Sequence, residues 1–268
     1  MNPRAKAVRR RRPRSGRGSG HIRHNRAVWD RVSAGYDRRH AKSLSGRSAE
    51  AWGVFRIPES TLRLLGPVRG VATLELGCGA SRWSIALARR GARAVGIDLS
   101  ARQLARARNL RAKAHLRFPL LRGSAERLPF RDRSFDLVFC DWGAMTFADP
   151  GRTVPECARV LRRGGAFVFA TANPFRYMAH DFSRDRMTRR LTRPYFGNER
   201  IDFGPGDTVE FQRTYAGWVA LFRANGFAIE RLIEPRPRLA QRTTYLSPSE
   251  VRWARSWPVE TIWKLVRE

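Results

Sequence analysis

One short stretch of the 268-residue chain spaces acidic residues and glycines in a way that could bind a nucleoside. Glu75 ends an apolar run and is followed by the turn Gly77-Cys78-Gly79, after which a helix is expected. Glycines let the backbone turn sharply and let a ligand approach it, and the free N–H groups of the next helix face that ligand. Asp98 follows Gly77 by 21 residues, a spacing at which a carboxylate accepts hydrogen bonds from ribose hydroxyls. These residues predict a site for a nucleoside-containing cofactor.

Two details of this turn bear on the kind of cofactor. The third glycine of a dinucleotide-binding turn would fall at Arg82, so a helix start that holds a pyrophosphate is disfavoured. Glu75 would also be a poor neighbour for a pyrophosphate, but it suits a ligand that carries positive charge. A nicotinamide-dependent oxidoreductase is therefore a disfavoured alternative.

The chain around the turn alternates between short apolar runs and amphipathic segments. Strands are expected at 71–76, 94–97, 116–121, 135–140 and 166–170, and helices at about 27–36, 58–65, 83–90, 100–113 and 153–162. Such alternation predicts a parallel sheet that is covered on both faces. A helix at 215–224 and strands at 227–233 and 259–266 are expected to follow. The long irregular stretches at 173–208 and 236–257 are candidate lids and acceptor segments.

The charge of the chain is strongly positive, with 53 Lys+Arg against 23 Asp+Glu and a net charge of +30. Residues 1–24 carry nine basic side chains and no acidic one, and we expect them to form a disordered tail because they can bury little apolar surface. One interpretation of the charge is binding to nucleic acid or to an anionic membrane. The other, which we favour because only four of the 53 basic residues are lysines, is a GC-rich codon bias.

The cysteines and the hydropathy indicate the compartment. The three cysteines, Cys78, Cys140 and Cys157, are too few for a disulfide framework, which favours a reducing, cytoplasmic location. No apolar run is long enough for a membrane-spanning helix. The cysteines and five histidines show no metal-ligand spacing, so no metal site is expected.

Five blocks of sequence, taken together, resemble one enzyme family. They are Glu75-Leu76-Gly77-Cys78-Gly79, Gly96-Ile97-Asp98-Leu99-Ser100, Ala125-Glu126-Arg127-Leu128-Pro129-Phe130, Ser134-Phe135-Asp136-Leu137-Val138 and Arg159-Val160-Leu161-Arg162-Arg163-Gly164-Gly165. In this order, and over about residues 71–171, they resemble the class I S-adenosylmethionine-dependent methyltransferases of the small-molecule, methyltransferase 11 type. Weaker similarity extends to Trp29-Asp30, Tyr36-Asp37 and the segment from Pro258 to Lys264. The resemblance implies an α/β fold over residues 25–268, with a Rossmann-like, doubly wound, seven-stranded and mostly parallel sheet whose last strand is antiparallel.

The resemblance also implies how S-adenosylmethionine would be bound. Glu75, Gly77 and Gly79 would shape the pocket for its methionine part, and Asp98 would hold the ribose. The remaining cofactor-binding residues that it implies are Tyr36, Cys78, Ser81, Leu99 beside the adenine, and Ser124 and Ala125 along the adenine edge. The family often has Gly in place of Ser81 and Asp in place of Ser124, so the contact with the adenine amino group is in doubt.

The acceptor side is less well defined by the sequence. Parallel strands deliver ligand-facing groups at their carboxyl ends, which places Asp141 and Trp142 after the fourth strand near the acceptor. By the same argument Asn173, Tyr177 and His180 follow the fifth strand. Asp141 and His180 are the candidate catalytic residues, although a surface loop histidine is the favoured interpretation of His180. Five aromatic residues of the candidate lids could line an acceptor pocket or simply cover the core: Phe175, Tyr195, Phe196, Tyr245 and Trp253.

The sequence therefore predicts methyl transfer from S-adenosylmethionine to an oxygen, nitrogen or carbon atom of a small molecule. RNA methylation that uses the basic tail is an alternative that we do not favour. A non-catalytic binding module that keeps the cofactor fold is a third. No membrane association is expected, and the acceptor and oligomeric state are not readable from the residues.

Overall fold

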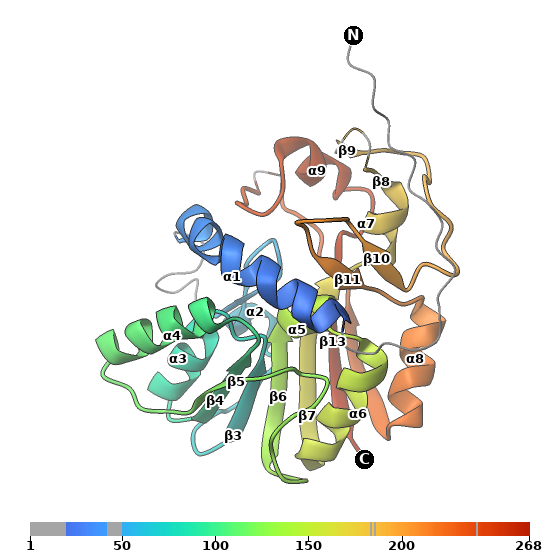
Figure 1. Ribbon diagram of the computed structural model, residues 1–268. Coiled ribbons are helices and arrows are strands. Elements are labelled where there is room, and N and C mark those ends of the chain that lie inside the picture. Colours follow the sequence, from blue (N-terminus) through green and yellow to red (C-terminus); the bar gives the residue numbers. More distant parts are fainter. Residues whose placement is uncertain (1–19, 42–49, 183, 185, 240) are drawn as a thin grey trace.

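A seven-stranded sheet forms the centre of the molecule in the computed structural model (Figure 1), which describes residues 20–41, 50–182, 184, 186–239 and 241–268. Its strand order is β12-β13-β7-β6-β3-β4-β5. The strands are β3 (Ala72–Leu76), β4 (Arg93–Asp98), β5 (Leu120–Arg122), β6 (Phe135–Asp141), β7 (Leu161–Ala172), β12 (Phe227–Ile233) and β13 (Glu260–Arg267). Only β13 runs antiparallel to its two neighbours, β7 and β12. The predicted fold class, including the antiparallel last strand, is confirmed.

Helices and small two-stranded sheets complete the described part of the chain. The helices are α1 (Gly20–His40), α2 (Glu59–Leu62), α3 (Arg82–Arg89), α4 (Ala101–Lys113), α5 (Gly143–Phe147), α6 (Pro150–Val160), α7 (Pro174–Ala179), α8 (Tyr215–Ala224) and α9 (Pro248–Trp253). The small sheets pair β1 (Ala51–Trp52) with β2 (Ile57–Pro58), β8 (His180–Asp181) with β9 (Arg186–Met187), and β10 (Arg200–Asp202) with β11 (Val209–Phe211).

The main sheet buries both of its faces, as a parallel sheet must. Along β6 the side chains alternate: Val138 and Cys140 pack with residues of α6 and α8, whereas Leu137 and Phe139 pack on the other face with Trp83 of α3. The aromatic rings of α8 and of β7 and β13 fill much of the first face. Because the sheet is held from both sides, the carboxyl ends of β3, β4, β6 and β7 are fixed along one edge.

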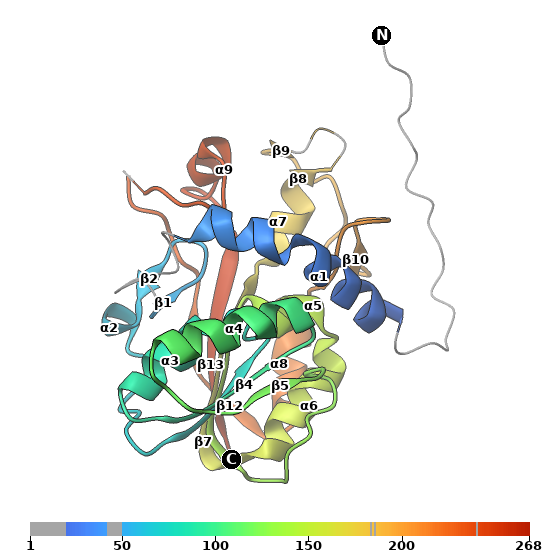
Figure 2. The ribbon, with the colours of Figure 1, turned by 60° about the vertical axis from the view of Figure 1, so that its left-hand side comes forward.

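Helix α1 lies across that edge. Figure 2 shows α1 running above α4 and α5, with α7 and α9 on its other side. Asn25 is fully buried, donates to the carbonyl oxygens of Phe147 (2.9 Å) and Val209 (2.8 Å), and accepts from the N–H of Val209 (2.7 Å). The Nε2 of His21 is 2.5 Å from the carboxylate of Glu126. These polar contacts attach α1 to α5 and β11.

The N-terminal boundary therefore differs from the expected one. Residues 20–24 belong to α1 and not to a disordered tail, because the contacts of His21 and Asn25 hold the first turns of the helix. The rest of the expected tail, residues 1–19, lies outside the described residues. Val32 of this helix is 38% exposed, although it is apolar.

Other elements agree with the expectations apart from their ends and the two irregular stretches. The expected strand at 116–121 is shorter: β5 begins only after Pro119, which has no N–H to donate. The expected helix at 153–162 begins and ends earlier, because Asp149 caps α6 and its last residues join β7. The stretches 173–208 and 236–257 contain short elements, namely α7, β8, β9, β10 and α9.

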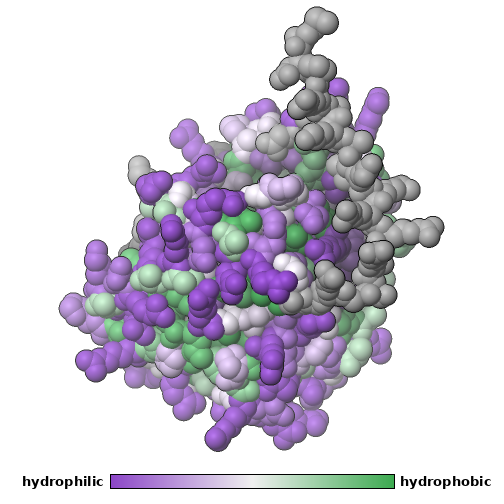
Figure 3. Space-filling view, in the orientation of Figure 1, coloured by the Kyte–Doolittle hydropathy of each residue, from purple (hydrophilic) through white to green (hydrophobic). Residues whose placement is uncertain are grey.

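The described surface is mainly polar. Hydrophilic side chains, including arginines of α4, cover much of the face in Figure 3. No helix among the described residues combines the length and the apolar character needed to cross a bilayer. The cytoplasmic location stays a prediction.

We predict that Asn25→Ala lowers the free energy of unfolding by about 2–3 kcal/mol. The substitution leaves the N–H and carbonyl groups of Val209 and the carbonyl of Phe147 without their buried partner. Urea denaturation measures the change. Arg23→Ala, on the exposed side of the same helix, should change stability by less than about 0.5 kcal/mol. Equal effects of the two substitutions would contradict the role given to Asn25.

Candidate functional site

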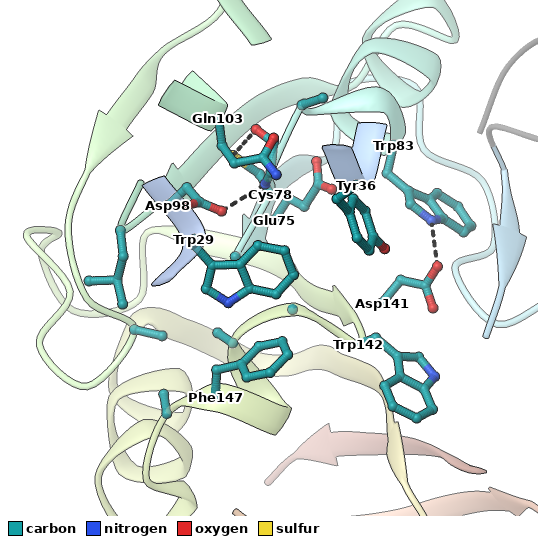
Figure 4. Close-up of a pocket in the computed structure, with 18 of the residues that line it drawn as sticks. Trp29, Tyr36, Glu75, Cys78, Trp83, Asp98, Gln103, Asp141, Trp142 and Phe147 are labelled. Carbon is teal, nitrogen blue, oxygen red and sulfur yellow. Dashed lines mark hydrogen bonds between the residues drawn. The ribbon is translucent and has the colours of Figure 1, made fainter. Parts of the chain in front are cut away.

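A cavity of about 350 Å³ lies at the carboxyl edge of the sheet, beneath α1. Figure 4 shows Asp98, Cys78 and Glu75 on one side of it, Asp141 and Trp142 on another, and rings from α1 and α5 between them. The structure brings ten of the sequence-predicted site residues together on its walls: Tyr36, Glu75, Gly77, Cys78, Gly79, Asp98, Leu99, Ser124, Ala125 and Asp141.

The turn after β3 has a backbone that glycine makes possible. Gly77 and Gly79 have φ angles of 61° and 51°, in the left-handed region that residues with a Cβ rarely adopt. A Cβ on Gly77 would lie 2.4 Å from the backbone nitrogen of Ala144 at the start of α5. Ser81 also has a positive φ, 58°, as the N-cap of α3, a conformation that glycine adopts more readily. The Ser81 side chain is buried behind the turn and does not line the cavity.

Asp98 ends β4 and is held by the backbone on both carboxylate oxygens. Its Oδ2 accepts from the N–H of Gly79 (2.8 Å) and its Oδ1 accepts from the N–H of Ser100 (2.8 Å). Burial raises the pKa of Asp98 to about 6, although these two N–H groups favour the charged form. The carboxylate is thus fixed in position, and each oxygen keeps a lone pair for a ligand hydroxyl.

Glu75 is the second buried acid of the cavity. Its Oε2 accepts from the backbone N–H of Ser84 (2.9 Å) and from the Ser84 hydroxyl. Burial raises the pKa of Glu75 to about 8. A bound positive charge would lower that value and stabilise the ionised form. The Cys78 thiol lies beside these acids, and burial raises its pKa well above the usual value.

The wall between β4 and β5 consists of Leu99, Ser124 and Ala125. The Ser124 hydroxyl accepts from the backbone N–H of Glu126 (3.2 Å), so it stabilises its own turn. Gln103 of α4 also lines the cavity, and its buried Oε1 has no hydrogen-bond partner among the described residues. Gln103 was not predicted as a site residue, because a polar residue in the first turn of an Arg-rich helix is expected to be exposed to solvent.

Asp141 lies at the end of β6, as predicted, but its carboxylate is occupied by neighbours. It accepts from the N–H of Gly53 (2.8 Å), from Nη1 of Arg56 (3.0 Å) and, at 3.4 Å, from the indole of Trp83. An arginine and two further donors thus engage both oxygens of this carboxylate. Asp141 therefore fixes the cavity wall and the Arg56 side chain.

The structure does not bring the three predicted residues that follow the fifth strand into the cavity. His180 begins β8, and its ring packs on Phe182 at 4.4 Å. The Asn173 amide donates to three side chains, including Thr261, and is buried. The Tyr177 hydroxyl donates to Glu210 (2.5 Å) beneath the wall.

Of the five lid aromatics, only Tyr245 lines the cavity. Phe175 and Trp253 pack in a separate apolar cluster, the Tyr195 hydroxyl accepts from the N–H of Tyr215, and Phe196 is 76% exposed.

Helix α1 contributes Tyr36, which the sequence assigned to the site, and Trp29, which it did not. Trp29 packs edge-to-face on Phe147 of α5 at 5.1 Å, and both rings line the cavity (Figure 4). Tyr36 lies 6.4 Å from Tyr245, and His40 stacks on Tyr245 at 4.2 Å. The apolar periodicity of α1 could have indicated Trp29, but the partner rings lie more than 100 residues away. No group of acidic, histidine or cysteine side chains suited to a metal ion occurs in the part of the chain that the structure describes.

Several known proteins that this chain resembles are methyltransferases. Residues 74–169 match the model of a methyltransferase domain. A demethylmenaquinone methyltransferase of Clavibacter sepedonicus is 35% identical over 142 residues, which are 53% of this chain and 55% of that protein. The chain thus matches just over half the length of these curated relatives.

Solved structures extend the similarity beyond the matched domain. An S-adenosylmethionine-dependent methyltransferase of Mesorhizobium loti has a TM-score of 0.65 at 27% identity and covers 78% of this chain and 96% of its own. The magnesium protoporphyrin IX methyltransferase of Synechocystis PCC 6803, solved with bound S-adenosylhomocysteine, has a TM-score of 0.59 at 16% identity, with 92% and 100% covered. The second likeness concerns the fold alone. Residues 74–169 are therefore a methyltransferase domain of the class I, S-adenosylmethionine-dependent type, with S-adenosylmethionine as the cofactor.

Proposed function

We propose that the protein transfers the methyl group of S-adenosylmethionine to an oxygen, nitrogen or carbon atom of a small molecule. The observation that carries this proposal is a single cavity with two kinds of wall. One wall has the buried acids and glycine turn of a nucleoside site, and the other has aromatic and arginine side chains of α1, α7 and the 236–257 segment. A roofed cavity of about 350 Å³ suits a small acceptor better than a polymer lying on a surface.

The residues present fit the cofactor. Asp98 is fixed by two backbone N–H groups and would accept hydrogen bonds from the ribose hydroxyls. The unpartnered Oε1 of Gln103 offers a further acceptor in the same wall. Glu75 would place negative charge near the methionine part. Leu99 and Ala125 would contact the adenine. The amino group of the adenine would be bound by partners other than Ser124.

The cofactor supplies an activated methyl group on a positively charged sulfur, so the protein has mainly to hold the acceptor in line. Transfer forms a bond from the acceptor to the methyl carbon and breaks the sulfur–carbon bond, whose electron pair stays on sulfur. Tyr36, Trp142 and Tyr245 would fix the orientation of the acceptor and exclude water. Asp141, bound to Arg56, would position this wall and would not remove a proton.

The relatives named as demethylmenaquinone methyltransferases support an aromatic, small-molecule acceptor. The rings of Trp29, Tyr36, Trp142, Phe147 and Tyr245 around the cavity agree with such an acceptor. The identity of the acceptor is to be found by turnover with candidate ring compounds.

We predict that S-adenosylhomocysteine raises the melting temperature and that NAD⁺ does not. A ligand at a hundredfold its Kd stabilises the native state by about 2.7 kcal/mol. For a chain of this size that corresponds to a rise of about 5–10 °C. Differential scanning fluorimetry measures the shift. A rise with NAD⁺ and none with S-adenosylhomocysteine would reject the methyltransferase proposal.

We predict that Asp98→Ala weakens S-adenosylhomocysteine binding at least tenfold, to about the extent expected for losing charge-assisted ribose hydrogen bonds. Isothermal titration calorimetry measures the affinity. Asp202→Ala, on the exposed end of β10, is the matched control and should bind as the wild type does. An unchanged affinity of Asp98→Ala would mean that Asp98 only stabilises the turn.

The same titrations should depend on pH. The ionised form of Asp98 accepts the ribose hydrogen bonds, and its pKa is about 6. Affinity should therefore rise from about pH 5 to about pH 7 in the wild type, and this rise should be absent in Asp98→Ala. A rise near pH 8, where Glu75 ionises, should persist in both proteins. If the rise near pH 6 is equal in both, Asp98 is not its source.

A further inference from the structure

The acceptor side of the cavity contains an arginine, Arg176, that forms no close ion pair with a carboxylate of the described residues. Three arginines line the cavity: Arg56, Arg82 and Arg176. Arg56 is paired with Asp141 at 3.0 Å, and Arg82 interacts electrostatically with Asp37. Among the described residues no carboxylate oxygen lies within 4 Å of the Arg176 guanidinium.

Glu210 is the acid that faces Arg176, and the Glu210 carboxylate oxygens accept hydrogen bonds from donors other than Arg176. It is half-buried, lines the same cavity, and accepts from the Tyr177 hydroxyl (2.5 Å) and from Thr208 (3.4 Å). Burial raises its pKa, while Arg176 acts in the opposite direction. Glu210 thus influences Arg176 through space but does not occupy its N–H groups.

The guanidinium of Arg176 is held over a rigid support. Its Cζ lies 5.4 Å from the ring centroid of Trp142. The Trp142 indole donates to Glu260 (2.8 Å), which also accepts from the N–H of Val54 (2.7 Å). Trp142 has a φ of 64°, a strained value for a tryptophan that its surroundings must impose. An arginine stacked on a ring keeps the donors in its own plane free for an anionic oxygen.

We propose that Arg176 is a specificity residue that binds an anionic oxygen of a planar aromatic acceptor, with Trp142 fixing its guanidinium. This inference rests on the proposed function and names the class of acceptor: an aromatic compound with an acidic hydroxyl or a carboxyl group. Such an acceptor enters the cavity already ionised, with its proton released to water. A dedicated base on the wall is then unnecessary, in agreement with the pairing of Asp141 and with the position of His180 outside the cavity.

The experiment compares two probes of equal shape and different charge, 2-naphthoate and 2-naphthamide. Each is titrated by calorimetry into protein saturated with S-adenosylhomocysteine. We expect the wild type to bind the naphthoate at least about tenfold more tightly than the naphthamide. Arg176→Met should remove this preference by weakening the naphthoate alone, and Arg176→Lys should restore part of it. Arg252→Met, an exposed arginine of α9 outside the cavity, should bind both probes as the wild type does.

Separate outcomes decide between the two proposals. If S-adenosylhomocysteine does not bind the wild type, the proposed function fails. If it binds and the naphthoate has no advantage, or does not bind, the role of Arg176 is rejected and the proposed function stands. A loss of S-adenosylhomocysteine affinity in Arg176→Met would also reject it, because Arg176 would then hold the cofactor. Thermal unfolding of each variant, with a melting temperature near that of the wild type, verifies that the variants are folded.

Discussion

The close approach of two backbone segments determines the geometry of the cavity. A Cβ on Gly77 would lie 2.4 Å from the nitrogen of Ala144, and one on Gly143 would lie 2.5 Å from the carbonyl oxygen of Gly77. Because neither position has room for a side chain, the turn after β3 and the start of α5 lie in direct contact. This contact sets the distance between the wall that contains Asp98 and the wall that contains Trp142. A methyltransferase needs that distance to be fixed, since transfer depends on the alignment of donor and acceptor.

Buried acids surround this contact, and they are costly for the folded state. Burial raises the pKa of Glu75, Asp98 and Glu260, to about 8, 6 and 7. Each is held by backbone or side-chain donors that recover part of the desolvation cost. Strongly perturbed carboxyl groups collected in one cavity are typical of functional sites. Glu260 differs from the others because it does not line the cavity and instead accepts a hydrogen bond from Trp142. Burial of Glu260 therefore fixes the position of the Trp142 side chain.

The sequence predicted the parts of the site that are built from local patterns. The glycine turn and Asp98 follow from short motifs, because a strand, a tight turn and a helix start are specified by neighbouring residues. The seven-stranded sheet with its antiparallel last strand was predicted from the family resemblance. Gln103 and Trp29 were missed as cavity residues, since their role depends on elements far away in the chain. Asp141 was placed correctly, but its pairing with Arg56 was not foreseeable, because 85 residues separate the two. His180 was misplaced because α7 and β8 continue past the end of β7 and take it away from the edge.

Helix α1, which forms the roof of the cavity, is held in place by other kinds of interaction than the walls are. Of the buried side chains of α1, only Val28 is apolar, whereas His21, Asn25, Asp37 and others are polar. Hydrogen bonds and ion pairs can be exchanged for water at small net cost, but buried apolar surface cannot. Lifting α1 is therefore expected to cost less free energy than opening the sheet. We therefore expect ligands to enter and leave the cavity beneath α1.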